Sequence, residues 1–208
     1  MFITFEGTEG SGKSHQGRLL VARLRDRGIA LVETHEPGGT PLGDEVRRLV
    51  LLRDDLGVSR RAEALLMNAS RAQLVEQVIR PALARGETVV CDRFADSTLA
   101  YRGAGRGLEE HELRSVISFA TAGLKPDMTI LLDVPVEVGL ARKHAGASDD
   151  WNRFEAETLA FHECVRRAYR RMAAEEPQRW HCFAGDRPAD EVAEEIWRAV
   201  APRLEIEP

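Results

Sequence analysis

Residues 7–14 read Gly-Thr-Glu-Gly-Ser-Gly-Lys-Ser and match the phosphate-binding pattern G-x-x-x-x-G-K-[ST] at every fixed position. An apolar run over residues 1–5 precedes this stretch, and apolar residues with helical spacing follow it over residues 15–27. The motif therefore lies between a predicted strand and a predicted helix, the context in which it binds phosphate. A chance glycine-rich turn is the alternative interpretation, and it does not account for this context.

The residue types within 7–14 suit a nucleoside triphosphate. Glycines allow successive backbone N–H groups to turn towards phosphate oxygens, and the N-terminus of the following helix adds partial positive charge. Lys13 can reach the β- and γ-phosphates, and the Ser14 hydroxyl can bind Mg²⁺. We therefore predict that the whole loop binds the triphosphate. Its members are Gly7, Thr8, Glu9, Gly10, Ser11, Gly12, Lys13 and Ser14.

Length and composition narrow the class of protein. A chain of 208 residues fits one α/β domain, or a core domain with a small lid. The formal net charge of −5 argues against a dedicated nucleic-acid binder. The sequence has no apolar run of about 18 residues that could span a membrane. Three cysteines far apart in the sequence suggest neither a zinc site nor disulfides, which favours a cytoplasmic protein.

Strand-like and helical segments alternate along the chain. Apolar runs typical of strands lie over residues 1–5, 29–33, 88–91, 128–132 and 180–183. Helical spacing recurs over residues 42–51, 62–84, 110–122, 136–142, 154–174 and 189–200. The alternation predicts an α/β fold with a parallel five-stranded sheet flanked by helices, in a single domain over residues 1–208. The polar segment 143–152 is either a lid or a surface connection.

Residues that follow the predicted strands are candidate site residues, because ligands of a parallel sheet bind beyond the carboxyl ends of its strands. Asp92 and Arg93 follow the third predicted strand. The Asp92 carboxylate can hold Mg²⁺ directly or through water, and a helix N-cap is its structural alternative. The forked guanidinium of Arg93 suits a second phosphate better than it suits a surface position.

Two other classes of P-loop protein lack support in the sequence. Guanine-nucleotide switches carry an Asn-Lys-x-Asp motif, and no Asn-Lys pair occurs here. Mechanical ATPases usually carry Asp-Glu at the end of a hydrophobic strand, whereas this strand ends in Asp92-Arg93. Transfer of phosphate between two nucleotides fits better, because two polyanions require more positive charge than one lysine and one Mg²⁺ provide.

Four blocks of residues resemble bacterial thymidylate kinases, which use ATP to phosphorylate dTMP to dTDP. The blocks are Glu36-Pro37-Gly38-Gly39-Thr40, residues 63–67 with 70–74, Asp92-Arg93-Phe94, and Ala100-Tyr101 with Gly105-Arg106-Gly107. The resemblance extends from Phe5 to about Tyr169. It implies a P-loop nucleoside monophosphate kinase fold with a lid over about 143–152, the use of ATP, Mg²⁺ and dTMP, and a homodimer formed through helices near 62–84 and 110–122.

The resemblance also implies contacts to the acceptor nucleotide. Glu9 matches the acidic residue that contacts the deoxyribose 3′-hydroxyl, and Tyr101 matches the tyrosine that excludes a ribose 2′-hydroxyl. Arg93 matches the arginine on the dTMP phosphate, with Arg47 as a second contact. The full implied substrate-binding set is Glu9, Glu36, Arg47, Met67, Arg71, Arg93, Thr98, Tyr101 and Arg102.

The implied catalysis is in-line transfer of the γ-phosphoryl group, with positioning and charge neutralisation supplying most of the effect. The loop of residues 7–14 lacks an arginine, so the resemblance implies that cations in or beside the lid supply charge. These cations are Arg142, Lys143 and Arg153. The implied catalytic set is Lys13, Asp92, Arg93, Arg142 and Arg153, with Ser14 and Asp92 as the Mg²⁺ ligands.

At the base, the resemblance implies contacts from Arg71 and Thr98, and two neighbouring positions depart from the family pattern. Met67 stands where a phenylalanine usually stacks on thymine, and methionine is more flexible. Arg102 stands where a base-reading glutamine is common, and arginine cannot accept a hydrogen bond from the pyrimidine N3–H.

These departures leave three interpretations. In the favoured one, the chain is a working thymidylate kinase in which Arg102 points to solvent or to phosphate. In the second, the pocket accepts a modified pyrimidine deoxynucleoside monophosphate with an extra acceptor group for Arg102. In the third, the chain is a nucleotide-binding paralogue with weak or lost catalysis. The presence of Lys13, Ser14, Asp92 and Arg93 argues against the third.

Overall fold

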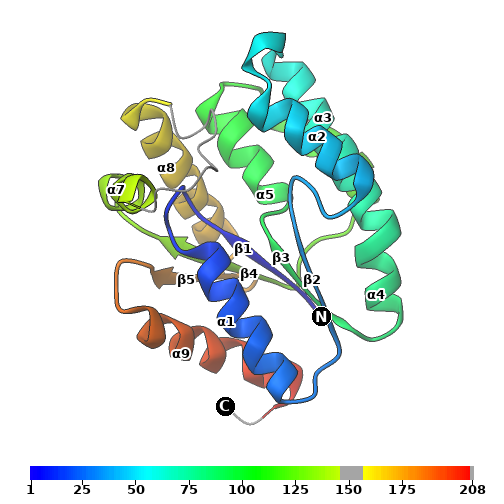
Figure 1. Ribbon diagram of the computed structural model, residues 1–208, viewed down its shortest axis with the longest axis vertical. Coiled ribbons are helices and arrows are strands. Elements are labelled where there is room, and N and C mark those ends of the chain that lie inside the picture. Colours follow the sequence, from blue (N-terminus) through cyan, green and yellow to red (C-terminus); the bar gives the residue numbers. More distant parts are fainter. Residues whose placement is uncertain (146–156, 207–208) are drawn as a thin grey trace.

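A computed structural model describes residues 1–145 and 157–206, and its centre is a five-stranded sheet (Figure 1). The order of the strands across the sheet is β2-β3-β1-β4-β5. Their bounds are β1 Phe2–Glu6, β2 Leu31–His35, β3 Thr88–Asp92, β4 Met128–Asp133 and β5 Trp180–Ala184. Every pair of neighbouring strands is parallel, so the predicted sheet is confirmed.

Helices cover both faces of the sheet, as predicted (Figure 1). They are α1 Lys13–Asp26, α2 Pro41–Leu52, α3 Arg60–Leu74, α4 Arg80–Ala84, α5 Ala95–Thr98, α6 Glu110–Thr121, α7 Val136–Ala145, α8 Leu159–Glu175 and α9 Ala189–Val200. Short 3-10 or π-helical segments are η1 Asp54–Leu56, η2 Val75–Ile79, η3 Leu99–Gly105 and η4 Ala201–Leu204. In β1, Ile3 and Phe5 pack with residues of α1 and α9, whereas Phe2 packs with Leu74 and Ile79. Side chains alternate along a strand, so an apolar β1 requires cover on both sides.

Three helical segments differ from the prediction. The run predicted over residues 62–84 is continuous but contains the π-helical η2 between α3 and α4. The consecutive α5 and η3 were not predicted, because Gly103 and Gly105 lower helix propensity there and the apolar residues lack a clear helical period. The helix predicted from residue 154 begins at Leu159, because Thr158 is its N-cap and accepts a hydrogen bond from the Phe161 N–H at 3.3 Å.

Lys143 belongs to α7, which continues through Ala145, instead of to a loop. The remainder of the predicted lid, residues 146–152, lies outside the described residues. In the part of the chain that the structure describes, no helix has both the length and the apolar character needed to cross a membrane.

Candidate active site

The predicted phosphate-binding loop connects β1 to α1. Gly7, Gly10 and Gly12 have φ angles of 143°, 66° and 94°, a region that other residues rarely adopt. At Gly10, a Cβ atom would lie 1.9 Å from the carbonyl oxygen of Gly139. Gly12 is the N-cap of α1, so the first N–H groups of this helix lie at the loop. The glycines of the motif thus permit both the turn and its close packing against α7.

Lys13 turns back across the inside of this loop. Its Nζ donates to the Thr8 carbonyl oxygen at 2.7 Å and to Ser11 Oγ at 3.2 Å. Burial lowers the pKa of Lys13 to about 8, and the positive charge of Arg93 acts in the same direction. A phosphate oxygen would restore the charged form, because an anion is a stronger partner for an ammonium group than a carbonyl oxygen is.

Asp92 lies beside the start of α1, as predicted. Strands β1 and β3 are neighbours with Phe5 opposite Asp92, and the Ser14 hydroxyl donates to Asp92 Oδ2 at 2.5 Å. The N-cap of α5 is Phe94, so the alternative role of Asp92 as the cap of that helix is wrong. A hydroxyl and a carboxylate are oxygen donors that fit Mg²⁺, which usually keeps several waters and binds substrate phosphates. Within the described residues, no cluster of three or more His, Cys, Asp or Glu could hold a metal ion.

Arg93 connects the loop to α5 and η3. Its Nη2 donates to Glu9 Oε1 at 2.8 Å and to the Tyr101 hydroxyl at 3.1 Å, while Nη1 donates to the Gly7 carbonyl oxygen at 3.1 Å. Burial alone would raise the pKa of Glu9, but the charges of Arg93 and Lys13 outweigh it and lower this pKa to about 2. The structure therefore brings Glu9, Arg93 and Tyr101 together, with Glu9 ionised.

One cavity of about 480 Å³, a size typical of small-molecule sites, collects most of the predicted residues. It is lined by residues 9–14 and by Glu36, Arg47, Met67, Arg71, Asp92, Arg93, Tyr101, Arg102, Arg142 and Lys143. Gly7 and Thr8 belong to the loop but do not line the cavity. Thr98, on α5, is fully buried and does not line the cavity either. Arg142 also donates to the Gly185 carbonyl oxygen at 2.7 Å. Arg153 lies outside the described residues.

Known proteins provide an independent comparison. A family model described as thymidylate kinase matches residues 5–196. The chain belongs to the thymidylate kinase family. A thymidylate kinase of Thermomicrobium roseum is 53% identical over 96% of this chain and 93% of its own length. One of Deinococcus radiodurans is 50% identical over 98% of this chain and 97% of its own length.

The fold agrees with the same family. A crystal structure of a thymidylate kinase from Ehrlichia chaffeensis has a TM-score of 0.78 and 31% sequence identity, and the match covers 96% of this chain and 97% of that one. The resemblance inferred from the sequence blocks is therefore confirmed, as is the P-loop nucleoside monophosphate kinase fold.

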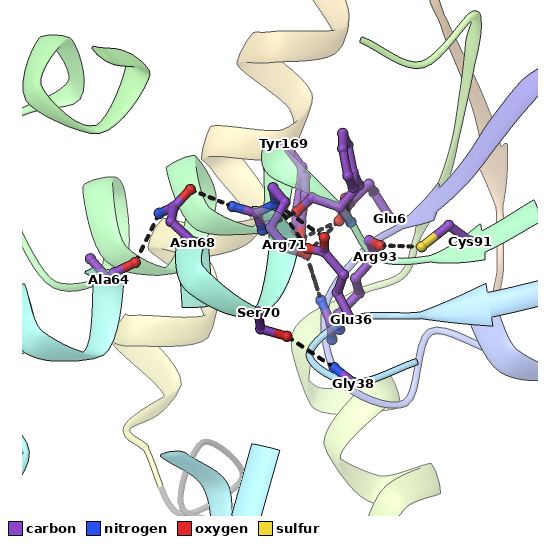
Figure 2. Close-up of polar contacts among 12 residues, drawn as sticks. Glu6, Glu36, Gly38, Ala64, Asn68, Ser70, Arg71, Cys91, Arg93 and Tyr169 are labelled. Carbon is purple, nitrogen blue, oxygen red and sulfur yellow. Dashed lines mark hydrogen bonds and ion pairs between the residues drawn. The ribbon is translucent and has the colours of Figure 1, made fainter. Parts of the chain in front are cut away.

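In this member of the thymidylate kinase family, Glu36 and Arg71, which both line the cavity, form a buried ion pair (Figure 2). Arg71 Nη2 and Nε donate to Glu36 Oε2 at 2.6 Å and 3.0 Å. Arg71 also donates to Asn68 Oδ1 and to the Phe94 carbonyl oxygen. Burial raises the pKa of Glu36, and Arg71 opposes that shift. The close two-point contact with a guanidinium favours the carboxylate form.

Arg102 lies in a different environment from the one expected. It is 3% exposed, so it does not point to solvent, and its Nε lies 3.0 Å from Glu63 Oε1 in the lining of the cavity. Burial lowers the pKa of Arg102 to about 9, and the charge of Arg71 contributes in the same direction. The Glu63 carboxylate balances its charge. Arg47, by contrast, bonds the Pro37 carbonyl oxygen at 3.2 Å near the same cavity.

Sequence reasoning missed four residues that support the site: Glu6, Glu63, Ser97 and Tyr169. Each contacts a predicted residue or its immediate neighbour. Glu6 offered a signal, because a carboxylate at the end of an otherwise buried strand requires buried hydrogen-bond donors. Glu63 and Tyr169 offered none, since their partners come from distant parts of the chain, and Ser97 lies only four residues after Arg93 but has no motif that marks it.

Proposed function

We propose that this chain transfers the γ-phosphoryl group of ATP to dTMP, giving ADP and dTDP. One observation carries the proposal: the triphosphate-binding loop and the cation predicted to bind the acceptor phosphate share one cavity, and Glu9 of the loop contacts Arg93 directly. The bond between the γ-phosphorus and the β,γ-bridging oxygen breaks, and a dTMP phosphate oxygen forms the new bond. No general base is required, because the acceptor oxygen is already anionic.

The donor nucleotide lies on the loop in this proposal. Backbone N–H groups at the start of α1 and the Lys13 ammonium hold the phosphates. Lys13 exchanges its present partners, the Thr8 carbonyl and the Ser11 hydroxyl, for phosphate oxygens. Ser14 and Asp92 hold Mg²⁺, which supplies charge neutralisation and orientation of the phosphates when bound. Arg142 and Lys143, which line the cavity from α7, add positive charge near the phosphates.

The acceptor lies between α3 and η3. Arg93 binds the dTMP phosphate together with Arg47, and Glu9 accepts a hydrogen bond from the deoxyribose 3′-hydroxyl. Tyr101 is 3% exposed and held by Glu9 and Arg93, so a ribose 2′-hydroxyl next to its ring has no room. The sugar is thereby selected by a side chain that cannot move aside without breaking two hydrogen bonds.

Thymine lies against Met67 and Arg71. Four of the five N–H groups of Arg71 donate to Glu36, Asn68 and the Phe94 carbonyl, which leaves one Nη1–H for a pyrimidine oxygen. Glu63 explains why an arginine is tolerated at position 102: the pair is balanced in charge, so Arg102 requires no extra acceptor group on the base. This favours dTMP over a modified pyrimidine nucleotide.

A homodimer through α3 and α6 completes the proposal. The two helices contact each other, and each carries an exposed large apolar side chain: Leu65 is 58% exposed and Phe119 is 90% exposed. Exposed apolar side chains on adjacent helices are typical of a protein interface. The cysteines Cys91, Cys164 and Cys182 are all free thiols, which fits a reducing cytoplasm.

Steady-state kinetics with ATP and Mg²⁺ and a panel of dTMP, dUMP and dCMP test the function. We expect the highest kcat/KM with dTMP. Arg93→Ala, which removes the phosphate-binding cation, should raise the KM for dTMP far more than the KM for ATP. Equal use of the three nucleotides would contradict the assignment of dTMP, and ATP binding without turnover of any would point to a regulatory nucleotide-binding protein.

A further inference from the structure

Glu6 is a fully buried carboxylate at the end of β1 (Figure 2). Oε1 accepts a hydrogen bond from the Phe94 backbone N–H at 2.8 Å. Oε2 accepts from the Ser97 hydroxyl at 2.6 Å and from the Tyr169 hydroxyl at 2.8 Å. Glu6 does not line the cavity, so it contacts neither nucleotide in the proposed reaction.

The backbone donor belongs to a strained turn. Arg93 has a φ of 71°, in the left-handed region that residues other than glycine rarely adopt. Such a conformation persists only where the surroundings hold it. Here the Arg93 N–H donates to the Phe5 carbonyl oxygen at 2.9 Å, and the next N–H, of Phe94, donates to Glu6. Two consecutive residues of β1 therefore hold the backbone that directs Arg93 into the cavity.

The two hydroxyls connect Glu6 to the guanidinium of Arg93. The two hydrogens of Arg93 Nη1 are shared among the Gly7 carbonyl oxygen at 3.1 Å, Ser97 Oγ at 3.3 Å and the Tyr169 hydroxyl oxygen at 3.4 Å. A hydroxyl has only one hydrogen. To accept a hydrogen bond from Arg93, the Ser97 and Tyr169 hydroxyls must each point that hydrogen away from the guanidinium. The two hydroxyl oxygens also lie 2.9 Å apart, where either could donate to the other. An ionised Glu6 is a pure acceptor within reach of both, and as a charged group it is the stronger partner for both hydrogens. Its charge therefore fixes the orientation in which both oxygens face Arg93.

The charges around Glu6 oppose one another. Burial and the charge of Asp96 on α5 raise the pKa of Glu6, Arg93 and the hydroxyl hydrogen bonds lower it, and the net pKa is raised to about 7. Asp96 is itself held by Arg179, which donates to Asp96 Oδ2 at 2.6 Å. The carboxylate form thus depends on Arg93 and on three donated hydrogen bonds, which couples Glu6 to the residue that it supports.

We infer that Glu6 is a positioning residue for the acceptor phosphate: through the Phe94 N–H and the Ser97 and Tyr169 hydroxyls, its carboxylate holds Arg93 in the orientation that binds dTMP. This inference rests on the proposed function, in which Arg93 binds the acceptor phosphate. It assigns no contact between Glu6 and either substrate. Its consequence is selective, because loss of the Glu6 charge affects the binding of dTMP and leaves the binding of ATP nearly unchanged.

Glu6→Gln tests the inference, because glutamine keeps the shape but offers an amide that donates to one hydroxyl. We expect the KM for dTMP, and the Kd measured by calorimetry with dTMP alone, to rise about tenfold, the size expected for a lost charge-assisted hydrogen bond. The KM for ATP should stay within about twofold. Thr4→Val is the matched control, since Thr4 is also buried on β1 and bonds Thr129 Oγ1 at 3.0 Å instead of the Arg93 group. It should lower the melting temperature without changing the KM for dTMP.

Two further variants decide the question even if Glu6→Gln does not fold. Ser97→Ala and Tyr169→Phe remove the connecting hydroxyls without touching β1, and each should raise the KM for dTMP. When Glu6→Gln is added to a variant that already carries both Ser97→Ala and Tyr169→Phe, it should raise the KM for dTMP less than it does in the wild type. The hydroxyls through which Glu6 acts are absent from that variant. An unchanged KM for dTMP in folded variants of Glu6, Ser97 and Tyr169 overturns the inference. A wild-type protein that does not turn over dTMP overturns the proposed function instead.

Discussion

The buried Glu36–Arg71 ion pair (Figure 2) allows a quantitative test of how much it stabilises the fold. The side chains of Arg71 and Glu36 are 1% and 3% exposed, so both charges are out of water. Glu36→Gln keeps the size of the side chain but removes its charge. The new amide group would also direct N–H hydrogens at the Nε–H and Nη2–H of Arg71, which donate to Glu36 now. Arg71 would keep Asn68 and the Phe94 carbonyl, which are neutral partners.

The expected cost follows from the burial of this pair. Removal of one partner of a buried ion pair costs about 3–5 kcal/mol, because the remaining charge is uncompensated. In a domain of this size, about 1 kcal/mol corresponds to a shift in melting temperature of about 2–4 °C. We therefore expect Glu36→Gln to lower the melting temperature by roughly 10 °C.

Circular dichroism measures both quantities, with the wild type and Glu36→Gln at the same pH and ionic strength. Urea unfolding gives the loss of unfolding free energy, and thermal unfolding gives the shift in melting temperature. Glu33→Gln is the matched control, because Glu33 lies on β2, which ends one residue before Glu36, and pairs with Arg25 at 3.3 Å in an exposed position. Exposed pairs contribute about 0–1 kcal/mol, so the control should unfold almost as the wild type does. If Glu36→Gln also lies within about 1 kcal/mol of the wild type, the buried pair does not hold Arg71 as argued.

Four other predictions follow from single contacts. Lys13→Ala should abolish turnover in a steady-state assay and barely change the melting temperature; retained activity would remove Lys13 from the mechanism. Ionised Glu9 should stabilise the fold above pH 4.5 and lose this effect as the pH falls towards 2, because its pKa is lowered from 4.5 to about 2 in the folded state. The difference in unfolding free energy between wild type and Glu9→Gln should therefore shrink by about 1 kcal/mol between pH 6 and pH 3.5, and a constant difference would refute this. Arg102→Gln should lower stability, since Glu63 loses its cation, but keep the preference for dTMP over dCMP within about threefold; a large gain in dTMP use would instead indicate that Arg102 reads another base. Phe119→Glu should convert a dimer to a monomer in light scattering, whereas an unchanged mass would place the interface elsewhere.

The fold was predictable because its determinants are local. The P-loop glycines and the apolar run of β1 act over a few neighbouring residues, and the alternation of strands and helices is a repeated local pattern. The error at α5 and η3 has a physical reason. That segment is helical because it packs between α8 and α3, and such tertiary packing overrides the low propensity of Gly103 and Gly105.

The site was predictable where a side chain lies near a motif, and less so where its role depends on a distant partner. Lys13, Asp92 and Arg93 lie at strand ends or in the loop, where the chemistry of the residue type points to the ligand. Arg102 was expected at solvent or phosphate, because nothing near it in the sequence indicates a pair with Glu63 on α3. The register between two helices decides that pair, and a sequence pattern does not contain it.

Three of the arginines that line the cavity are each paired with a glutamate: Arg71 with Glu36, Arg93 with Glu9, and Arg102 with Glu63. The pairs differ in burial, since the side chains of Arg93 and Glu9 are each 17% exposed whereas those of the other two pairs are 1–3% exposed. An ion pair that is almost fully buried is costly to break, so we expect the Glu36–Arg71 and Glu63–Arg102 pairs to stay intact when a ligand binds. The partly exposed pair can exchange its partner, and a phosphate is a strong competitor for a guanidinium. Glu9 belongs to the phosphate-binding loop, so in the proposed reaction the binding of an acceptor phosphate to Arg93 would change the contacts of that loop and couple the two substrates through one ion pair.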